Sequence, residues 1–600
     1  MVSLGDFTTS RRQLGRLSLV ALFLGLTGGI VAFLLLRLIG LITHLTYDGV
    51  LNASLAPPSI ARLGWWSVLI PVAGGLAVGL LARFFSQQIR GHGIPEAIQA
   101  ILENESRMDA RVAIAKPVAS AITIGTGGPF GAEGPIIMTG GAIGSLTAQW
   151  LPLSAVERRV LLVAGAAAGM SATFGAPLSS VFLAVELLLF EWRPRSVLPV
   201  MVASVAAYGM RVWLLGSAAI FATRPLPWGS FGWLFWAAAV GIAAGTASGL
   251  LTKAVYLVED LYHRLPLHWM WWPAIGGLFV GLGGMVDPAA LGVGYPAIRG
   301  LDAGHILLTA AALLLAVKAV IWILSLSSGT SGGVLAPLLM MGGAIGALLG
   351  AVLPGHDPGL WATVGMAAML GGTMRAPFTA TVFAMETTHD WGIVLPVFVG
   401  SMVAMAVTVL WIPRSILTEK VARRGTHVAR EYGVHPLEGS RVSSLMVPKD
   451  AVITVSPDMP LREAAARLLG DPKRHHGAYP VVDAAGTVVG VLSRLALLST
   501  VPGDNTPVSR VMVPPVPVAP SARARHAVEL MARHDTRWLL VKDAGVFVGW
   551  MTQVDLLPAW RRAVREEEVR TRIFALPFGS RRTHLPSSAA DSTPEDPSAV

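Results

Sequence analysis

The chain has 600 residues, of which only 14% are charged and 53% are hydrophobic, whereas a soluble protein carries about 25% charged residues. This composition excludes an ordinary water-soluble enzyme and indicates a polytopic membrane protein, and the absence of cysteine excludes disulfides and thiolate metal sites. A formal net charge of +10 is compatible with nucleic-acid binding. We favour another explanation of this charge, which is that Lys and Arg accumulate on the cytoplasmic side of membrane segments.

Six uncharged stretches are each long enough to cross a hydrocarbon core of about 30 Å as a helix. They are Leu17–Leu36, Leu63–Ala82, Val160–Val185, Gly229–Thr252, Ala319–Gly355 and Gly392–Pro413. The first follows three arginines and lacks a signal-peptide cleavage site, so we expect it to remain in the mature protein. The sequence predicts a multi-pass protein of the cell membrane with cytoplasmic N- and C-termini.

The character of the chain changes after Ile412, where basic residues mark a cytoplasmic exit from the membrane. We therefore expect a transmembrane domain over residues 1–425 and a soluble α/β domain over residues 426–575. Residues 576–600 are rich in Pro and Ser and are predicted to be disordered.

The membrane part contains an internal repeat of long period. Residues 131–146 match residues 333–348 at an offset of 202, and both contain the string GGAIG. At an offset of 200, eight residues between Gly165 and Glu186 recur between Gly365 and Glu386. Membrane proteins built from two halves place the substrate at the repeat interface, on interrupted helices. The identities alone do not show whether the halves are parallel or inverted.

Gly and Pro interrupt the apolar pattern in three segments, which are GHGIPE at 91–96, GAEGP at 131–135 and GVLAP at 333–337. Glycine permits close backbone approach, and Pro suits the first turn of the helix that follows. Three such N-termini that converge would bind an anion through free N–H groups and helix dipoles. The alternative is that Gly and Pro only kink packed helices. Because there are three segments, two of them related by the repeat, we favour the anion site.

These segments resemble the signature motifs of the CLC family of chloride channels and chloride/proton antiporters, in members with a C-terminal CBS pair. The similarity extends to GTGGPFGAEGP at 125–135, GGVLAP at 332–337, and the paired segments at 174–187 and 375–387. It implies a polytopic α-helical membrane protein of two inverted repeats with broken helices, followed by a cytoplasmic α/β CBS-pair domain. It also implies a homodimer that moves chloride through the lipid bilayer, with no enzymatic activity, required cofactor, metal or nucleic-acid partner.

The resemblance implies that the anion-binding residues lie in the three segments and at one further position. They are Gly91, His92, Gly93, Ile94, Pro95, Gly131, Gly134, Pro135, Gly333, Val334, Leu335, Ala336 and Leu417. It makes Glu133 the gate, whose carboxylate occupies the outer anion position until it is protonated or displaced. A carboxylate in an uncharged stretch is costly and by itself indicates function. The alternative is an ion pair with a cation such as Lys116.

Three residues depart from the family pattern near the central anion. His92 replaces a Ser, and its imidazole either hydrogen-bonds the anion with pH sensitivity or turns away to be satisfied by backbone. Leu417 replaces a Tyr and Leu335 replaces a Phe. We therefore expect a loosely coordinated central anion, held mainly by the amides of Val334 and Leu335.

Leu187 stands where antiporters of this family usually carry an intracellular proton-relay glutamate, and an apolar side chain cannot pass a proton. We therefore expect a passive chloride channel gated by voltage or pH. The alternative is a chloride/proton antiporter with a different relay, since Glu186 and Glu191 lie nearby. Glu186 recurs as Glu386, which favours a structural role for this glutamate.

The soluble part contains a second repeat. Val452–Ser499 and Val516–Leu556 each show a short β pattern, an amphipathic helix, two β runs and a Gly-x-x-Ser/Thr turn. They resemble a CBS pair, at about 441–500 and 508–560.

The second CBS-like turn keeps Gly549, Thr552 and Asp555 in the family's pattern for phosphate and ribose contacts, whereas Ala496 replaces the Asp of the first turn. The resemblance thus implies one adenine-nucleotide site, with Thr552 and Asp555 in it. The alternative is a pair without a ligand.

Other classes of protein fit less well. Gly329-Thr330-Ser331-Gly332, with His389 as a base, matches the short GxSG pattern of intramembrane serine proteases, but such a string is common in a chain with 65 Gly. A sodium-coupled solute transporter would require polar clusters that the three interrupted segments lack. A membrane sensor that transports nothing is the remaining alternative, and a measurement of anion flux distinguishes all of these.

Overall fold

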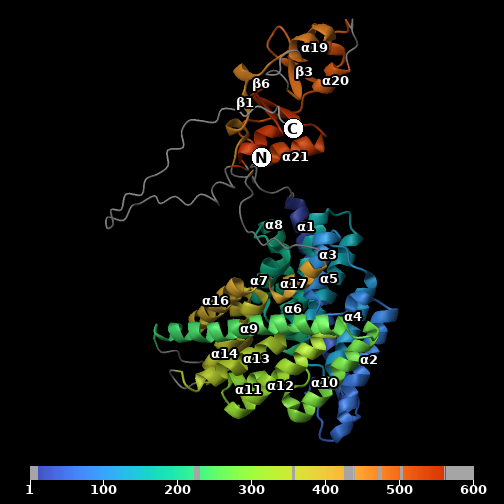
Figure 1. The fold of residues 1–600 in the computed structure, drawn as a ribbon, viewed down its shortest axis with the longest axis vertical. Coiled ribbons are helices and arrows are strands. Elements are labelled where there is room, and N and C mark those ends of the chain that lie inside the picture. Colours follow the sequence, from blue (N-terminus) through green and yellow to red (C-terminus); the bar gives the residue numbers. More distant parts are fainter. Residues whose placement is uncertain are drawn as a thin grey trace, which may run out of the picture. The chain divides into compact units, whose positions relative to one another are not determined.

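The computed structural model describes residues 11–221, 230–353, 358–424, 437, 440–469, 476–499, 505–559 and 561. The chain forms two units, Met1–Tyr432 and Gly433–Val600 (Figure 1). The first unit is helical, and the second combines strands with helices. The tail over 576–600, which we expect to be disordered, lies outside the described residues.

The described residues of the first half of the membrane unit form eight α-helices. They are α1 (Arg11–Thr43), α2 (Leu69–Phe84), α3 (Ile94–Glu103), α4 (Ala110–Gly125), α5 (Glu133–Gln149), α6 (Ala155–Phe174), α7 (Pro177–Leu183) and α8 (Pro194–Leu215).

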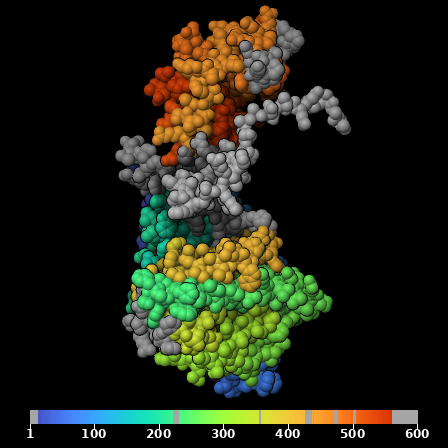
Figure 2. All heavy atoms as spheres, turned by 60° about the vertical axis from the view of Figure 1, so that its left-hand side comes forward, coloured from blue at the N-terminus to red at the C-terminus, as the bar shows by residue number. Residues whose placement is uncertain are grey.

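The second half has the same series and one more helix. Its members are α9 (Trp233–His263), α10 (Trp272–Val286), α11 (Tyr295–Asp302), α12 (Leu308–Ser327), α13 (Leu335–Gly350), α14 (Pro358–Met374), α15 (Pro377–Thr388), α16 (Val394–Trp411) and α17 (Ile416–Arg423). Figure 2 shows α9 and α16 side by side on one face of this unit.

Seven helices in the described part of the chain are long and apolar enough to cross a membrane. Two of the six predicted spans are wrong as single helices. Val160–Val185 is broken between α6 and α7, because Gly175 ends α6 at a φ of +65° and Pro177 begins α7. Ala319–Gly355 contains the end of α12, a Gly-rich loop and all of α13.

The two halves are related by inversion. Gly131 and Gly333, which are equivalent in the repeat, pair with each other as an antiparallel bridge, with N···O distances of 3.2 and 2.9 Å. Glu186 accepts from the first backbone amides of α15, and its equivalent Glu386 accepts from those of α7. Such reciprocal contacts are expected of a two-fold relation between the halves, and both halves contain the predicted broken helices.

The second unit has two sheets and confirms the predicted α/β class. Strands β1 (Val447–Pro448), β6 (Val546–Thr552), β5 (Trp538–Asp543) and β4 (Pro517–Val518) form a sheet in that order, in which only β4 and β5 are parallel. Strands β2 (Ala478–Val482) and β3 (Val488–Ser493) form an antiparallel pair. The described helices are α19 (Leu461–Leu469), α20 (Arg494–Leu498) and α21 (Ala524–Arg533).

Candidate anion site

Three helices begin where their preceding loops come close together. A Cβ on Gly134 would lie 2.0 Å from the carbonyl oxygen of His92 and 3.0 Å from the Cα of Gly333, so the loops before α3, α5 and α13 meet at positions that only glycine fits. Gly93 is also restricted, because its φ is +92° and a Cβ there would lie 2.6 Å from the Gly134 carbonyl oxygen. The three predicted segments are therefore brought together.

Glu133 is the first residue of α5, and its side chain is fully buried. Its Oε1 accepts a hydrogen bond of 3.1 Å from the amide of Ala336 at the start of α13, and the amide of Leu335 also faces the carboxylate. Its Oε2 has no hydrogen-bond partner among the described residues. The carboxylate thus lies at amide donors of the opposite half, as an anion would.

Lys116 does not form the alternative ion pair with Glu133. Its Nζ donates to the carbonyl oxygens of Ile89 at 2.8 Å and Gly91 at 2.6 Å, and so holds the loop that precedes α3. Satisfying backbone carbonyls is a common task for a buried ammonium group.

The equivalent of that loop in the second half was missed in the sequence. GVGYP at 292–296 repeats GHGIP at 91–95 with an offset of 201, and Lys318, 202 residues after Lys116, donates to the carbonyls of Ala290 at 2.8 Å and Gly292 at 3.1 Å. The sequence signal for this second loop is a short Gly-x-Gly-x-Pro pattern, which becomes visible when the two halves are aligned.

His92 lies two residues before the start of α3 and is 3% exposed. Its Nδ1 has no hydrogen-bond partner in the described part of the chain, so this nitrogen is not satisfied by backbone. The charged groups that face the ring are Glu96, Lys116, Lys420 and Arg424. An imidazole with a free nitrogen beside several cations is suited to contact an anion.

Leu417 is fully buried in the first turn of α17, which packs against α3. The side chain offers no donor at this position. The nearby hydroxyl of Tyr256 on α9 donates instead to the carbonyl of Ile416, at 2.5 Å. No local sequence pattern indicates this contact.

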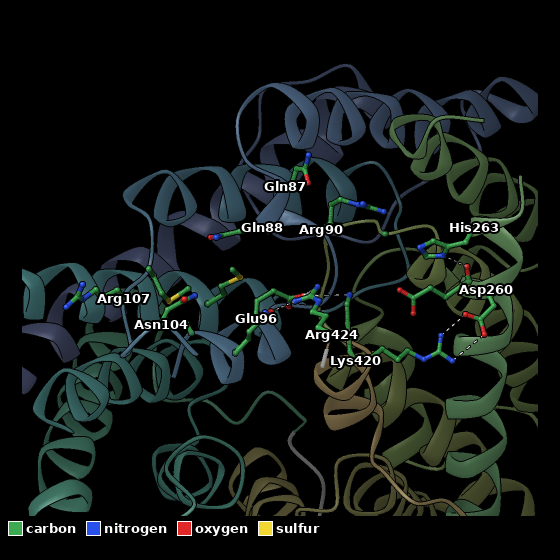
Figure 3. A pocket seen from close by; sticks show the side chains of 17 residues that line it. Gln87, Gln88, Arg90, Glu96, Asn104, Arg107, Asp260, His263, Lys420 and Arg424 are labelled. Atoms are coloured by element: carbon green, nitrogen blue, oxygen red, sulfur yellow. Dashed lines mark hydrogen bonds and ion pairs between the residues drawn. The ribbon is translucent and has the colours of Figure 1, made fainter. Parts of the chain in front are cut away.

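A polar cavity of about 770 Å³ opens beside these residues, between α3, α9 and α17 (Figure 3). Glu96 lies at its centre, where it pairs with Arg424 at 3.2 Å and Lys420 at 3.7 Å. The other oxygen of Glu96 accepts from the amide of Gly93 at 2.9 Å. The cavity therefore brings solvent to the N-terminus of α3, and its basic residues attract anions.

The glutamates considered as proton carriers are engaged in structural contacts. Glu186 accepts from the amide of Thr379 at 2.8 Å in the first turn of α15. Glu191 pairs with Arg159 at 3.3 Å and Arg193 at 3.7 Å. Leu187 is fully buried. These contacts fit capping and pairing of helix ends better than proton transfer.

The serine of the GxSG string has a different partner from the one a protease requires. Ser331 Oγ hydrogen-bonds Ser120 Oγ at 2.8 Å in a fully buried position. His389, the base considered for that reading, ends α15 in a left-handed conformation at a φ of +60°.

The turn after β6 is closed by Asp555. One of its carboxylate oxygens accepts from the Thr552 amide at 2.6 Å and from the Thr552 hydroxyl at 2.8 Å. In the first repeat, the Ser493 hydroxyl accepts from the Ala496 amide at 3.2 Å. Thr552 and Asp555 are thus brought together, and the carboxylate keeps a second oxygen for a ligand.

The chain matches known proteins over both units. Residues 74–409 match the family described as voltage gated chloride channel, and residues 442–503 and 508–562 match the CBS domain. A ClcB-like protein of Ralstonia nicotianae, named a chloride channel only provisionally, is 30% identical over 56% of this chain and 81% of its own length. The H(+)/Cl(-) exchange transporter ClcA of Klebsiella pneumoniae is 30% identical over 56% of this chain and 75% of its own length.

Solved structures share the fold. A slow cyanobacterial Cl-/H+ antiporter superposes with a TM-score of 0.61 at 23% identity, over 68% of this chain and 98% of its own. A eukaryotic CLC transporter superposes with a TM-score of 0.58 at 21% identity, over 91% of this chain and 99% of its own. The resemblance and the fold class predicted from the sequence are both confirmed.

Proposed function

The chain belongs to the voltage gated chloride channel family and carries out CLC-type anion transport, and we propose that it exchanges chloride, or a similar small anion, for protons. The sequence predicts passive conductance instead, because Leu187 replaces the usual proton-relay glutamate and Leu417 replaces a hydrogen-bond donor to the central anion. The family relatives support exchange better, because those at 30% and 31% identity include several named H(+)/Cl(-) exchange transporters.

One observation carries the proposal. The carboxylate of Glu133 accepts hydrogen bonds from the backbone amides at the start of α13. These amides are the kind of donor that an anion requires. A charged carboxylate competes with chloride for them, whereas a protonated carboxyl group loses most of its attraction to the helix terminus. Anion entry is thereby tied to proton uptake by Glu133, which is the requirement for coupled exchange.

The assignment of the remaining residues follows from the same geometry. We assign the central anion to the region where His92 and the N-termini of α3 and α13 meet, beside the polar cavity. The cavity faces the cytoplasm in this proposal, because Arg423 and Arg424 line it and follow the positive-inside rule. The termini are then cytoplasmic, in the cell membrane.

Two further properties belong to the proposal as the family relation suggests them. The protein is a homodimer, each subunit having its own anion pathway. The CBS pair binds one adenine nucleotide through Thr552 and Asp555, because the second turn keeps a carboxylate that the first turn lacks.

The function is tested with purified protein in liposomes, by recording chloride efflux and external pH together. Exchange predicts that chloride efflux drives proton uptake into the liposomes, and that a protonophore abolishes the net pH change while chloride efflux continues. Chloride efflux without proton movement would contradict exchange and restore the passive channel. A lack of any anion flux would leave the transport assignment without support.

A further inference from the structure

A buried tyrosine close to Glu133 has no assigned task. Tyr295 is the first residue of α11, and only 8% of it is exposed. Its ring packs edge-on against Phe174 and Phe221, with centroid distances of 6.4 and 5.6 Å. Its hydroxyl, however, has no hydrogen-bond partner among the residues that the structure describes. A buried hydroxyl without a partner is costly, so a partner in another state of the protein is expected.

The complementary acceptor is Oε2 of Glu133, which is also buried and also unpartnered. The Tyr295 hydroxyl lies within electrostatic range of the Glu133 carboxylate. This helix is pressed against α13, because a Cβ on Gly294 would lie 1.9 Å from the terminal methyl of Met340. The donor is therefore fixed next to the helix whose amides hold the gate.

The two cations that face this pair are already engaged. Arg211 on α8 faces Tyr295, and Lys318 on α12 faces Glu133. Both cations donate to backbone carbonyls, which are those of Ala172 and Thr173 for Arg211, and those of Ala290 and Gly292 for Lys318. The phenol, unlike these two cations, has no hydrogen-bond partner among the described residues.

The repeat supports a special role for this residue. The position equivalent to Tyr295 in the first half is Ile94, which is fully buried at the start of α3. The scaffold therefore accepts an apolar side chain at this point of the fold. The hydroxyl occurs only in the half whose helix terminus faces Glu133.

We propose that Tyr295 is a positioning residue for the gate, whose hydroxyl hydrogen-bonds the Glu133 carboxyl group after this group leaves the amides of Leu335 and Ala336. The inference rests on the proposed gating role of Glu133 and adds a receptor for its released state. By stabilising that state, Tyr295 increases the fraction of time in which the anion site is free. The bond exchanges one hydrogen-bond partner of the carboxyl group for another, and no covalent step is involved.

The test is a double-mutant cycle in liposomes with Tyr295→Phe, Glu133→Ala and the double variant, which separates the pair from independent effects. Phe keeps the ring and its contacts with Phe174 and Phe221. We expect Tyr295→Phe to lower chloride turnover by about fivefold, the effect of one neutral hydrogen bond, and to move the pH of half-maximal flux to more acidic values. In the Glu133→Ala background, we expect the same substitution to leave chloride flux unchanged.

Two results overturn the inference while leaving the proposed function intact. One is a Tyr295→Phe variant with wild-type turnover and pH profile. The other is an equal loss of flux in both backgrounds, which would show a purely structural role. A Glu133→Ala variant that keeps wild-type proton coupling would instead remove the gate and, with it, the inference. The flux of each variant is compared at equal amounts of monodisperse protein, which excludes defects of folding. Tyr295→Leu serves as a control for loss of the aromatic ring.

Discussion

The two halves of the membrane unit have the same scaffold but different chemistry at their meeting point. Lys116 and Lys318 hold equivalent loops, and Glu186 and Glu386 cap equivalent helices. By contrast, Glu133 is matched by Leu335. These repeated lysines and glutamates thus hold loops and cap helices, whereas the unrepeated Glu133 lies at backbone amides of the opposite half.

The same contrast holds for α3 and α11. Both follow a Gly-x-Gly turn with two left-handed glycines. The first half has His92 and Glu96 there, while the second has Val293 and Tyr295. Duplication therefore provides two helix N-termini of one kind, and the differences between them make the pathway asymmetric. In the proposed exchange, this asymmetry separates the proton step from the anion step.

The largest effect is expected at the residue that breaks the symmetry most. Glu133→Ala should abolish proton movement coupled to chloride while chloride flux continues, because no carboxylate remains to compete for the α13 amides. Simultaneous recording of pH and chloride measures the number of protons moved per chloride. The matched control is Leu335→Ala at the equivalent position, which should keep coupling. Loss of coupling in both variants, or in neither, would contradict the assigned asymmetry.

The symmetric glutamates should behave alike. Glu186→Ala and Glu386→Ala each leave two helix N-terminal amides without their acceptor, and each should lower the free energy of unfolding by roughly 1–3 kcal/mol. Thermal unfolding of the detergent-solubilised protein compares the two midpoints. If Glu186→Ala instead removed proton coupling in well-folded protein, Glu186 would be a relay and not a cap.

A smaller effect is expected at the central anion. Leu417→Tyr adds a hydroxyl donor, which should tighten chloride binding by about fivefold. Isothermal titration of chloride measures the change, with Leu417→Phe as the control that adds only the ring. Equal affinities of the two variants would show that position 417 does not face the anion.

The smallest effect on transport is expected in the second unit. Asp555→Ala should weaken binding of ATP or AMP to the full-length protein by about tenfold, since it removes a charged hydrogen-bond acceptor. Transport without nucleotide should stay at the wild-type rate. Calorimetry that detects no nucleotide on the wild-type protein would leave the CBS pair without this ligand. Ala496→Asp tests whether the first turn gains a site.

Much of this account follows from the sequence, because Gly, Pro and isolated charges carry strong local signals. The repeat, the three interrupted segments and Glu133 were all found in this way. The break inside Val160–Val185 was missed, since hydropathy does not distinguish one long helix from two short ones. The break inside Ala319–Gly355 was indicated by GVLAP, although hydropathy alone predicted a single span there. The exchange of glutamate caps between the halves depends on tertiary contacts and has no local signature.

The buried polar atoms without hydrogen-bond partners could not be predicted from the sequence, for a different reason. The hydroxyl of Tyr295 and the Nδ1 of His92 are notable because they have no hydrogen-bond partner among the described residues. Only a folded arrangement shows whether a buried donor has found a partner. The GVGYP segment, in contrast, was available in the printed sequence, and a systematic comparison of the halves would have identified it.

The most direct test of coupled exchange is the reversal potential of the anion current in a bilayer or in liposomes. Chloride is set equal on both sides, and a proton gradient is imposed. Exchange through Glu133 predicts that the reversal potential moves away from zero as the gradient grows, and that it returns to zero in Glu133→Ala. A reversal potential fixed by chloride alone in the wild-type protein would contradict this account and establish a passive channel.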